Sequence, residues 1–217
     1  MRKILFAGMA IVLASVLSSC GGNLVFSTGT FIAQTFSDIR ADGDVSFDPV
    51  TSTFTVSHAS STGNVIFGIN DAAPGSNSVE FRAFLDFPLD GSNSGDAVPA
   101  GATIVSADIE VFVGRVDFAT TVPTLLDLIT YDPVTGPVAG DFTNPTPLAF
   151  RSLDFLATDA GNLVRIDVTS LMREAQRLGL RNFQLRFLLD LVPGAAGLVT
   201  ISDSESSTAP LLTVEYF

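Results

Sequence analysis

The sequence has almost no cysteine, histidine or lysine and no tryptophan, and these shortages exclude several classes of function. One Cys among 217 residues leaves no internal disulfide, and one Cys with one His leaves no conventional zinc site. Tryptophan, the largest aromatic platform on which the apolar face of a sugar ring can stack, is absent. The only Lys is Lys3, so every other basic residue is Arg.

Positive charge is also scarce. The chain has 23 acidic residues against 11 basic ones and a net charge of −12. Nucleic acids attract clustered Lys and Arg, so we expect no nucleic-acid partner. In contrast, 47% of the residues are hydrophobic and 18 are Phe, which is enough to build a core and rules out a disordered chain. The length suits one domain of ordinary size, or two very small ones.

The first twenty residues predict a targeting signal. A basic start, Met1-Arg2-Lys3, precedes fourteen mostly apolar residues from Ile4 to Leu17. A membrane-spanning helix needs about 20 residues, so the run indicates a secretory signal peptide over residues 1–19. Without its two basic residues, the mature chain carries a net charge of −14.

The residues that follow this run resemble the lipobox of bacterial lipoproteins. Leu17, the small residues Ser18 and Ser19, and then Cys20 match its pattern. The resemblance implies that the Cys20 thiol accepts the diacylglycerol and that cleavage occurs before it. Gly21 after the Cys is similar to Gram-negative lipoproteins sent to the outer membrane, which implies a lipid-anchored protein of the cell envelope. The alternative is an ordinary signal peptide with an incidental Cys.

The rest of the chain predicts one all-β domain. We interpret residues 20–37 as an N-terminal tether or a first strand, and residues 38–217 as a single β-sandwich domain. Apolar residues alternate with polar ones over 79–87, 107–113 and 183–189, which is typical of half-buried strands. Eight or nine such short strands predict an antiparallel β-sandwich (jelly roll).

Local signals add a hairpin, a loop and a helix to these strands. Asp48-Pro49 between two alternating segments predicts a hairpin, and the Pro-rich residues 133–147 predict an irregular loop. One short helix near the C-terminus is expected over 170–178, capped by Thr169 or Ser170 and ended by Gly179. On it, Glu174 and Arg177 are spaced to form an ion pair.

Three stretches together resemble the DNRLRE-type module, a secreted β-sandwich family related to certain carbohydrate-binding modules. They are Arg82–Leu89 continuing through Val98 to Val111, then Ile166–Leu171, and finally Ser202–Glu205 with Ala209–Tyr216. The resemblance covers residues 64–217 and implies the sandwich fold and a role in holding polysaccharide. The chain lacks the Trp that the family usually carries before its Asp-Val-Thr strand.

No residue pattern marks a catalytic site. His58 is the only His, and nothing around it identifies it as a base, so we interpret it as a structural or surface residue. Many carboxylate pairs are possible among 23 acids, and none is singled out. We therefore predict no catalytic residues and no enzymatic activity.

Three acidic segments could supply oxygen ligands to a calcium ion. They are Asp42-Gly43-Asp44 with Asp38 and Asp48, the loop from Asp90 to Asp96, and Asp203-Ser204-Glu205. None has EF-hand spacing, and Asp and Ser are also common turn residues. We favour the turn interpretation, so no metal or other cofactor is predicted, although a structural calcium ion stays possible.

Sugar binding would need exposed apolar side chains beside polar ones. Phe84, Phe112 and Leu188 fall on the polar faces of their strands, and we favour their being covered by a second layer or by the helix. The hypothesis that follows is a lipid-anchored surface protein whose domain binds glycan without cutting it. The alternatives are an assembly subunit that binds an envelope protein and, less favoured, a polysaccharide-degrading enzyme. The ligand-binding residues are not predicted.

Overall fold

The computed structural model describes residues 29–192, 195–204 and 208–217. The described strands are, in chain order, β1 (Phe31–Phe36), β2 (Gly43–Asp48), β3 (Thr53–His58), β4 (Asn64–Ile69), β5 (Glu80–Pro88), β6 (Ile104–Asp117), β7 (Thr121–Ile129), β8 (Ala149–Leu156), β9 (Asn162–Asp167), β10 (Asn182–Leu189), β11 (Gly197–Ser202) and β12 (Leu211–Tyr216). Between them lie the helices α2 (Ala59–Thr62) and α3 (Thr169–Leu178) and the 3-10 turns η1 (Ala139–Phe142) and η2 (Ala157–Asp159).

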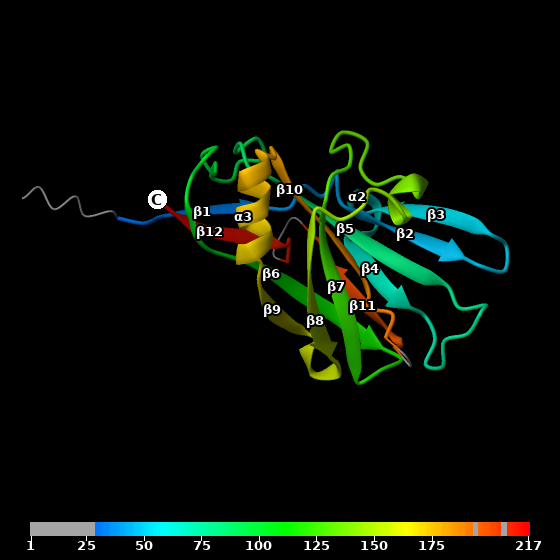
Figure 1. Ribbon diagram of the computed structural model, residues 1–217. Helices are drawn as coiled ribbons and strands as arrows, with labels where there is room; N and C mark the ends of the chain where they lie inside the picture. The colour runs from blue at the N-terminus through cyan, green and yellow to red at the C-terminus, as the bar shows by residue number, and fades with distance from the viewer. Residues whose placement is uncertain (1–28, 193–194, 205–207) are drawn as a thin grey trace, which may run out of the picture.

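All of the strand pairs are antiparallel, which confirms the predicted all-β class. The sheet runs in the order β1-β12-β6-β11-β4-β5-β10-β7-β8, with the β2–β3 hairpin added at β5 and β9 added at β6. This large sheet curls, so its two halves face each other across a common core in a sandwich-like arrangement (Figure 1).

The predicted number of elements was too low. The described residues hold twelve strands and a second, four-residue helix, whereas eight or nine strands and one helix were expected. The prediction missed β8 because Phe150 and Leu156 are exposed while Phe155 is buried, so apolar residues occupy both of its faces. It also missed β11, a short strand in which only Val199 and Ile201 point into the core.

The main core lies between the two halves of the sheet, and α3 closes one end of it. Leu85, Phe187 and Ile109 are fully buried there, as their alternation predicts. Leu171, Met172 and Ala175 share one face of α3, and α3 packs against β6 and β8. Figure 1 shows the β2–β3 hairpin extending away from α3, at the opposite end of the molecule.

A smaller second cluster explains why apolar residues occur on the polar face of β5. Phe84 is fully buried against Tyr131, with ring centroids 5.7 Å apart, and Phe142 and Val45 complete the cluster. The segment from Tyr131 to Phe142 covers Phe84, rather than the second layer or the helix that we expected. On other strands, Leu188 is 9% exposed and Phe112 is partly buried.

Two local expectations have definite outcomes. The hairpin across Asp48-Pro49 is present as β2 paired with β3. The predicted cap of α3 is wrong, because Val168 occupies the N-cap position and makes no side-chain cap. Asp167 takes over this role by accepting the N–H of Thr169 at 2.9 Å, while the Thr169 hydroxyl bonds to the backbone of Ala107.

Of the predicted tether or first strand, residues 20–37, the structure describes residues 29–37. Strand β1 lies within this segment and pairs with β12. Its outer edge is covered by the loop after β5, since the N–H of Asp96 bonds to the Gln34 carbonyl and the Asp96 carboxylate accepts the N–H of Gln34. No helix among the described residues is long and apolar enough to cross a membrane.

Candidate functional site

A groove of about 600 Å³ lies beside the β2–β3 hairpin. The hairpin forms one wall, and the outer face of β4, β11 and β6 forms the other. This hollow exists because β4 pairs with β5 only at Gly68 and Ile69, so the sheet opens between them. The lining residues are Asp44, Ser46, Thr55, Ser57, Thr62, Asn64, Ile66, Phe81, Gly114, Arg115 and Thr200.

Asp44 is the most buried ionisable group of the groove. Its residue is 5% exposed, and its carboxylate accepts the backbone N–H of Ile66 at the open edge of β4. Burial outweighs this hydrogen bond and raises the pKa of Asp44 to about 7. With its pKa raised this far, the Asp44 carboxyl can hold a proton near neutral pH and donate a hydrogen bond.

Alternation along the hairpin explains why this wall is polar. Val45, Phe47 and Val56 point to the second cluster, so their neighbours Ser46 and Ser57 turn to the groove. The backbones of the two strands come very close at Gly43, where a Cβ atom would overlap the carbonyl oxygen of Ser57. Glycine at this position therefore lets the hairpin form beside Asp44.

The opposite wall adds an amide, a hydroxyl, a cation and an apolar surface. Asn64 and Thr200 come from neighbouring strands, and Arg115 lies at the exposed rim with its guanidinium 2.8 Å from Asp117. Phe81, partly exposed, supplies the aromatic surface of the groove. Hydroxyl, amide and carboxyl groups around an aromatic ring suit a ligand rich in hydroxyl groups.

The groove contains one carboxylate among its described lining residues, Asp44. Glycoside hydrolysis ordinarily needs two carboxyl groups on either side of the scissile bond. His58, the other residue weighed for catalysis, does not line the groove; it ends β3, and its imidazole lies against Gly136. The lining side chains can form hydrogen bonds and contact a ligand through one aromatic ring.

The acidic segments considered as calcium ligands separate into two groups. Asp48 accepts the N–H of Val50, and Asp90 accepts the N–H of Ser92, as turn residues do. Hydrogen bonds from these turns lower the pKa of both carboxyls. These two residues thus follow the turn interpretation.

Unlike Asp48 and Asp90, Asp42 and Asp203 are fully buried and lie next to each other. The carboxyls of Asp42 and Asp203 are within hydrogen-bonding reach, and burial followed by the charge of Asp203 raises the pKa of Asp42 well above its usual value. Asp86, also fully buried, donates its backbone N–H to Asp42 at 2.6 Å. Within the described ranges, no group of three or more His, Cys, Asp or Glu side chains is arranged to hold a metal ion.

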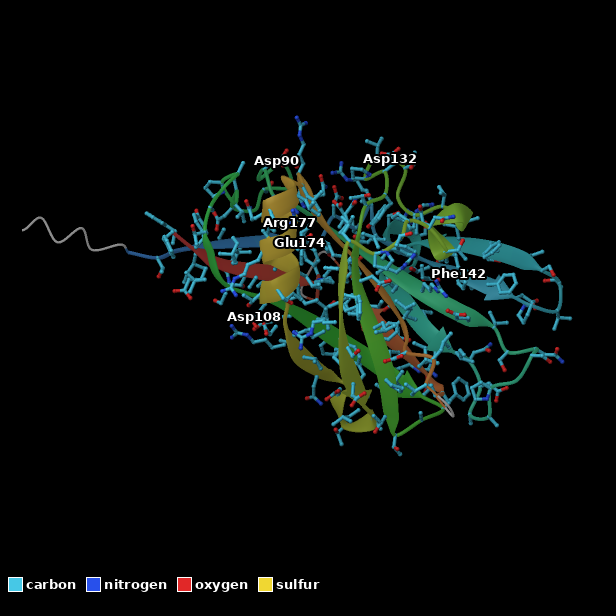
Figure 2. The ribbon with its side chains drawn as sticks, in the orientation of Figure 1. Asp90, Asp108, Asp132, Phe142, Glu174 and Arg177 are labelled. Carbon is cyan, nitrogen blue, oxygen red and sulfur yellow. The ribbon has the colours of Figure 1, made fainter. Side chains whose placement is uncertain are left out.

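Helix α3 carries several Arg residues, and these side chains form ion pairs or pack against the sheet. Arg177 contacts Glu174 at 2.6 Å on the solvent side of α3, and Figure 2 shows these two side chains together. Arg173 donates to the backbone carbonyls of Ile104 and Val105 instead. These contacts tie α3 to β6.

Comparison with known proteins adds no assignment. No family model matches the chain, and no curated protein matches its sequence. Cys20, the predicted lipid attachment site, lies outside the described residues. Sequence reasoning did not identify the groove, although the polar alternation of Asp44 with Ser46 and of Thr55 with Ser57 was a signal for one of its walls.

Proposed function

We propose that this protein is a lipid-anchored envelope protein whose β domain binds a neutral glycan in the groove without cutting it. The groove of about 600 Å³ carries the proposal, because it combines Asp44, several hydroxyl groups and Arg115 with the ring of Phe81. The resemblance of residues 64–217 to DNRLRE-type modules and of Leu17–Cys20 to a lipobox supports the same function.

The charge of the chain indicates a neutral ligand. A mature protein with a net charge of −14 repels strongly anionic polymers at low salt. One exposed cation, Arg115, lines the groove among the described residues, and it is paired with Asp117. Neutral polysaccharides with free hydroxyl groups avoid this repulsion and match the hydrogen-bonding groups present.

Weak binding is expected for this composition. The single aromatic ring that lines the groove is Phe81, among the residues described, and the chain has no Trp. Aromatic side chains supply much of the apolar contact area in a binding site. The free energy of binding should therefore depend mainly on hydrogen bonds to Asp44, Asn64 and the hydroxyl groups.

The test is retention of the detergent-solubilised full chain on a panel of neutral and acidic polysaccharides. We expect retention on a neutral glycan, lost in Phe81→Ala and in Asp44→Ala, and unchanged in Asp154→Asn, whose carboxylate is exposed on β8. The same incubations should release no reducing ends. Product release abolished by one Asp or Glu substitution would instead establish a polysaccharide-degrading enzyme, and no retention on any glycan would favour an envelope protein as partner.

A further inference from the structure

A cluster of buried aspartates lies where the loops after β1 and β11 meet the middle of β5. Asp42, Asp86 and Asp203 are each 0% exposed. The ionised groups that act on Asp42 and Asp86 are other aspartates, namely Asp203 on Asp42, and Asp38 and Asp90 on Asp86. Several negative charges in one dry region are strongly unfavourable without protons or a cation.

Nearby polar groups relieve this charge only in part. Asn182 and Gln184 donate to both oxygens of Asp86, at 2.7 to 3.0 Å. Arg40 is 78% exposed, and its guanidinium pairs with Asp38 at 2.7 Å, on the outside of the cluster. Ser37 donates its hydroxyl to Asp203 at 3.3 Å. On Asp42, the backbone N–H of Asp86 occupies the Oδ1 atom only.

Two buried oxygens, one on Asp42 and one on Tyr131, lack a hydrogen-bond partner. The Oδ2 atom of Asp42 has no hydrogen-bond donor, and the hydroxyl of the buried Tyr131 has no partner. Tyr131 is close enough to feel the charges of Asp42, Asp86 and Asp203, and burial together with these charges raises its pKa well above the ordinary value. Unpaired polar atoms are rare in protein interiors and commonly mark a bound water or ion.

We propose that Asp42, which follows β1, and Asp203, which follows β11, bind one calcium ion between them. Two carboxylates neutralise one divalent cation, and Ca²⁺ prefers carboxylate, hydroxyl and carbonyl oxygens. Ser37 supplies a neutral oxygen beside Asp203, and the buried Tyr131 hydroxyl is close enough to feel the charges of both carboxyls. Magnesium suits the site less well, because it keeps several waters in a strict octahedron.

Two depressions of the surface lie beside the cluster. Ser37 and Asp86 line two neighbouring depressions of about 530 and 340 Å³, which share Asp38, Arg40 and Ser92. Asp38, held ionised because hydrogen bonds from Arg40 lower its pKa, would attract a cation at the entrance. The site is separate from the groove, whose lining residues include neither Asp42 nor Asp203.

Terbium luminescence tests the proposal directly, because Tb³⁺ occupies calcium sites and is excited by a nearby tyrosine. The full chain in detergent, freed of metal with EGTA, should show tyrosine-sensitised emission that added Ca²⁺ suppresses. Tyr131 and Tyr216 are the two tyrosines of the chain. Tyr131→Phe should abolish the emission, and emission that persists in this variant would place the ion elsewhere and overturn the proposal.

Thermal unfolding gives an independent measurement. A ligand that binds the folded state at a hundred times its Kd raises the midpoint of a domain of this size by roughly 5–10 °C. We expect this rise with Ca²⁺ in the wild type, in Tyr131→Phe and in Asp154→Asn, and not in Asp42→Asn. A wild type with neither emission nor a calcium-dependent midpoint would mean that the two carboxyls share a proton, and the proposal would be wrong.

Discussion

Arg186 and Asp127 form an ion pair 2.8 Å long in the interior of the protein, with both side chains at most 5% exposed. The two residues face each other in register on β10 and β7. The remaining guanidinium nitrogen donates to the carbonyl oxygen of Asp141 at 3.0 Å, in the loop that covers the second cluster. This pair therefore connects the sheet to the segment that buries Phe84.

Arg186→Met should destabilise the protein strongly, because it leaves the Asp127 carboxylate buried without its cation. Breaking a buried ion pair from one side costs about 3–5 kcal/mol. Urea unfolding of wild type and variant measures the difference. Arg177→Met, which removes the exposed partner of Glu174, is the control and should leave the midpoint unchanged. A loss below about 1 kcal/mol for Arg186→Met would show that the covering loop does not depend on this pair.

Truncations in the main core should show that the alternating strands share one interior. Leu85 and Phe187 are fully buried, so Leu85→Ala and Phe187→Ala should each lower the free energy of unfolding by about 2–5 kcal/mol. Glu110→Ala, on the partly exposed face of β6, should cost little. Calorimetry should show one transition in each variant, and two transitions in the wild type would contradict a single cooperative domain.

The strands that the sequence predicts well have one solvent-facing side. On β6, Ile109 and Val111 are buried and Glu110 is partly exposed, so the period of two is visible. On β5, burial continues from Ala83 through Pro88, because the loop after β7 covers the second face. The alternation of residues along a strand cannot show that a segment almost fifty residues away packs over it. The burial of Phe84 was therefore predicted, but not the segment that buries it.

The candidate site could not be assembled from the sequence for a similar reason. Asp44 and Thr200 line one groove although they are far apart in the chain. The pairing of β2 with β5, of β5 with β4 and of β4 with β11 brings them together. The sequence offers Asp42 and Asp203 as oxygen ligands, but their burial in one cluster depends on segments that are far apart in the chain. Turn-forming aspartates such as Asp48 look identical to these buried ones in the sequence.

Lipidation at Cys20 is a prediction that intact-mass spectrometry can test. The chain extracted from membranes should begin at Cys20 and carry at least two acyl chains, because one chain anchors a protein only marginally. Cys20→Ser should yield an unprocessed or released protein. A mature N-terminus without added acyl mass would contradict the prediction and leave an ordinary signal peptide.

Stability should fall as the pH rises from about 4 to 7, because two buried carboxyls keep their protons in the folded state. Burial raises the pKa of Asp44 to about 7 and that of Asp86 to about 6, from 3.8. In this range the unfolded chain binds fewer protons than the folded one, so the stabilising contribution is complete below about pH 4 and is lost as the pH passes 6 and 7.

At 1.36 kcal/mol per pKa unit, the Asp44 contribution is on the order of 4 kcal/mol. Asp44→Asn keeps a neutral side chain at every pH and should therefore remove a large part of the decline, whereas Asp154→Asn should not. Urea unfolding at pH 5 and pH 8 measures the difference, with EGTA present so that a bound cation does not contribute. An equal decline in wild type and Asp44→Asn would show that Asp44 is ionised in the folded protein across this range.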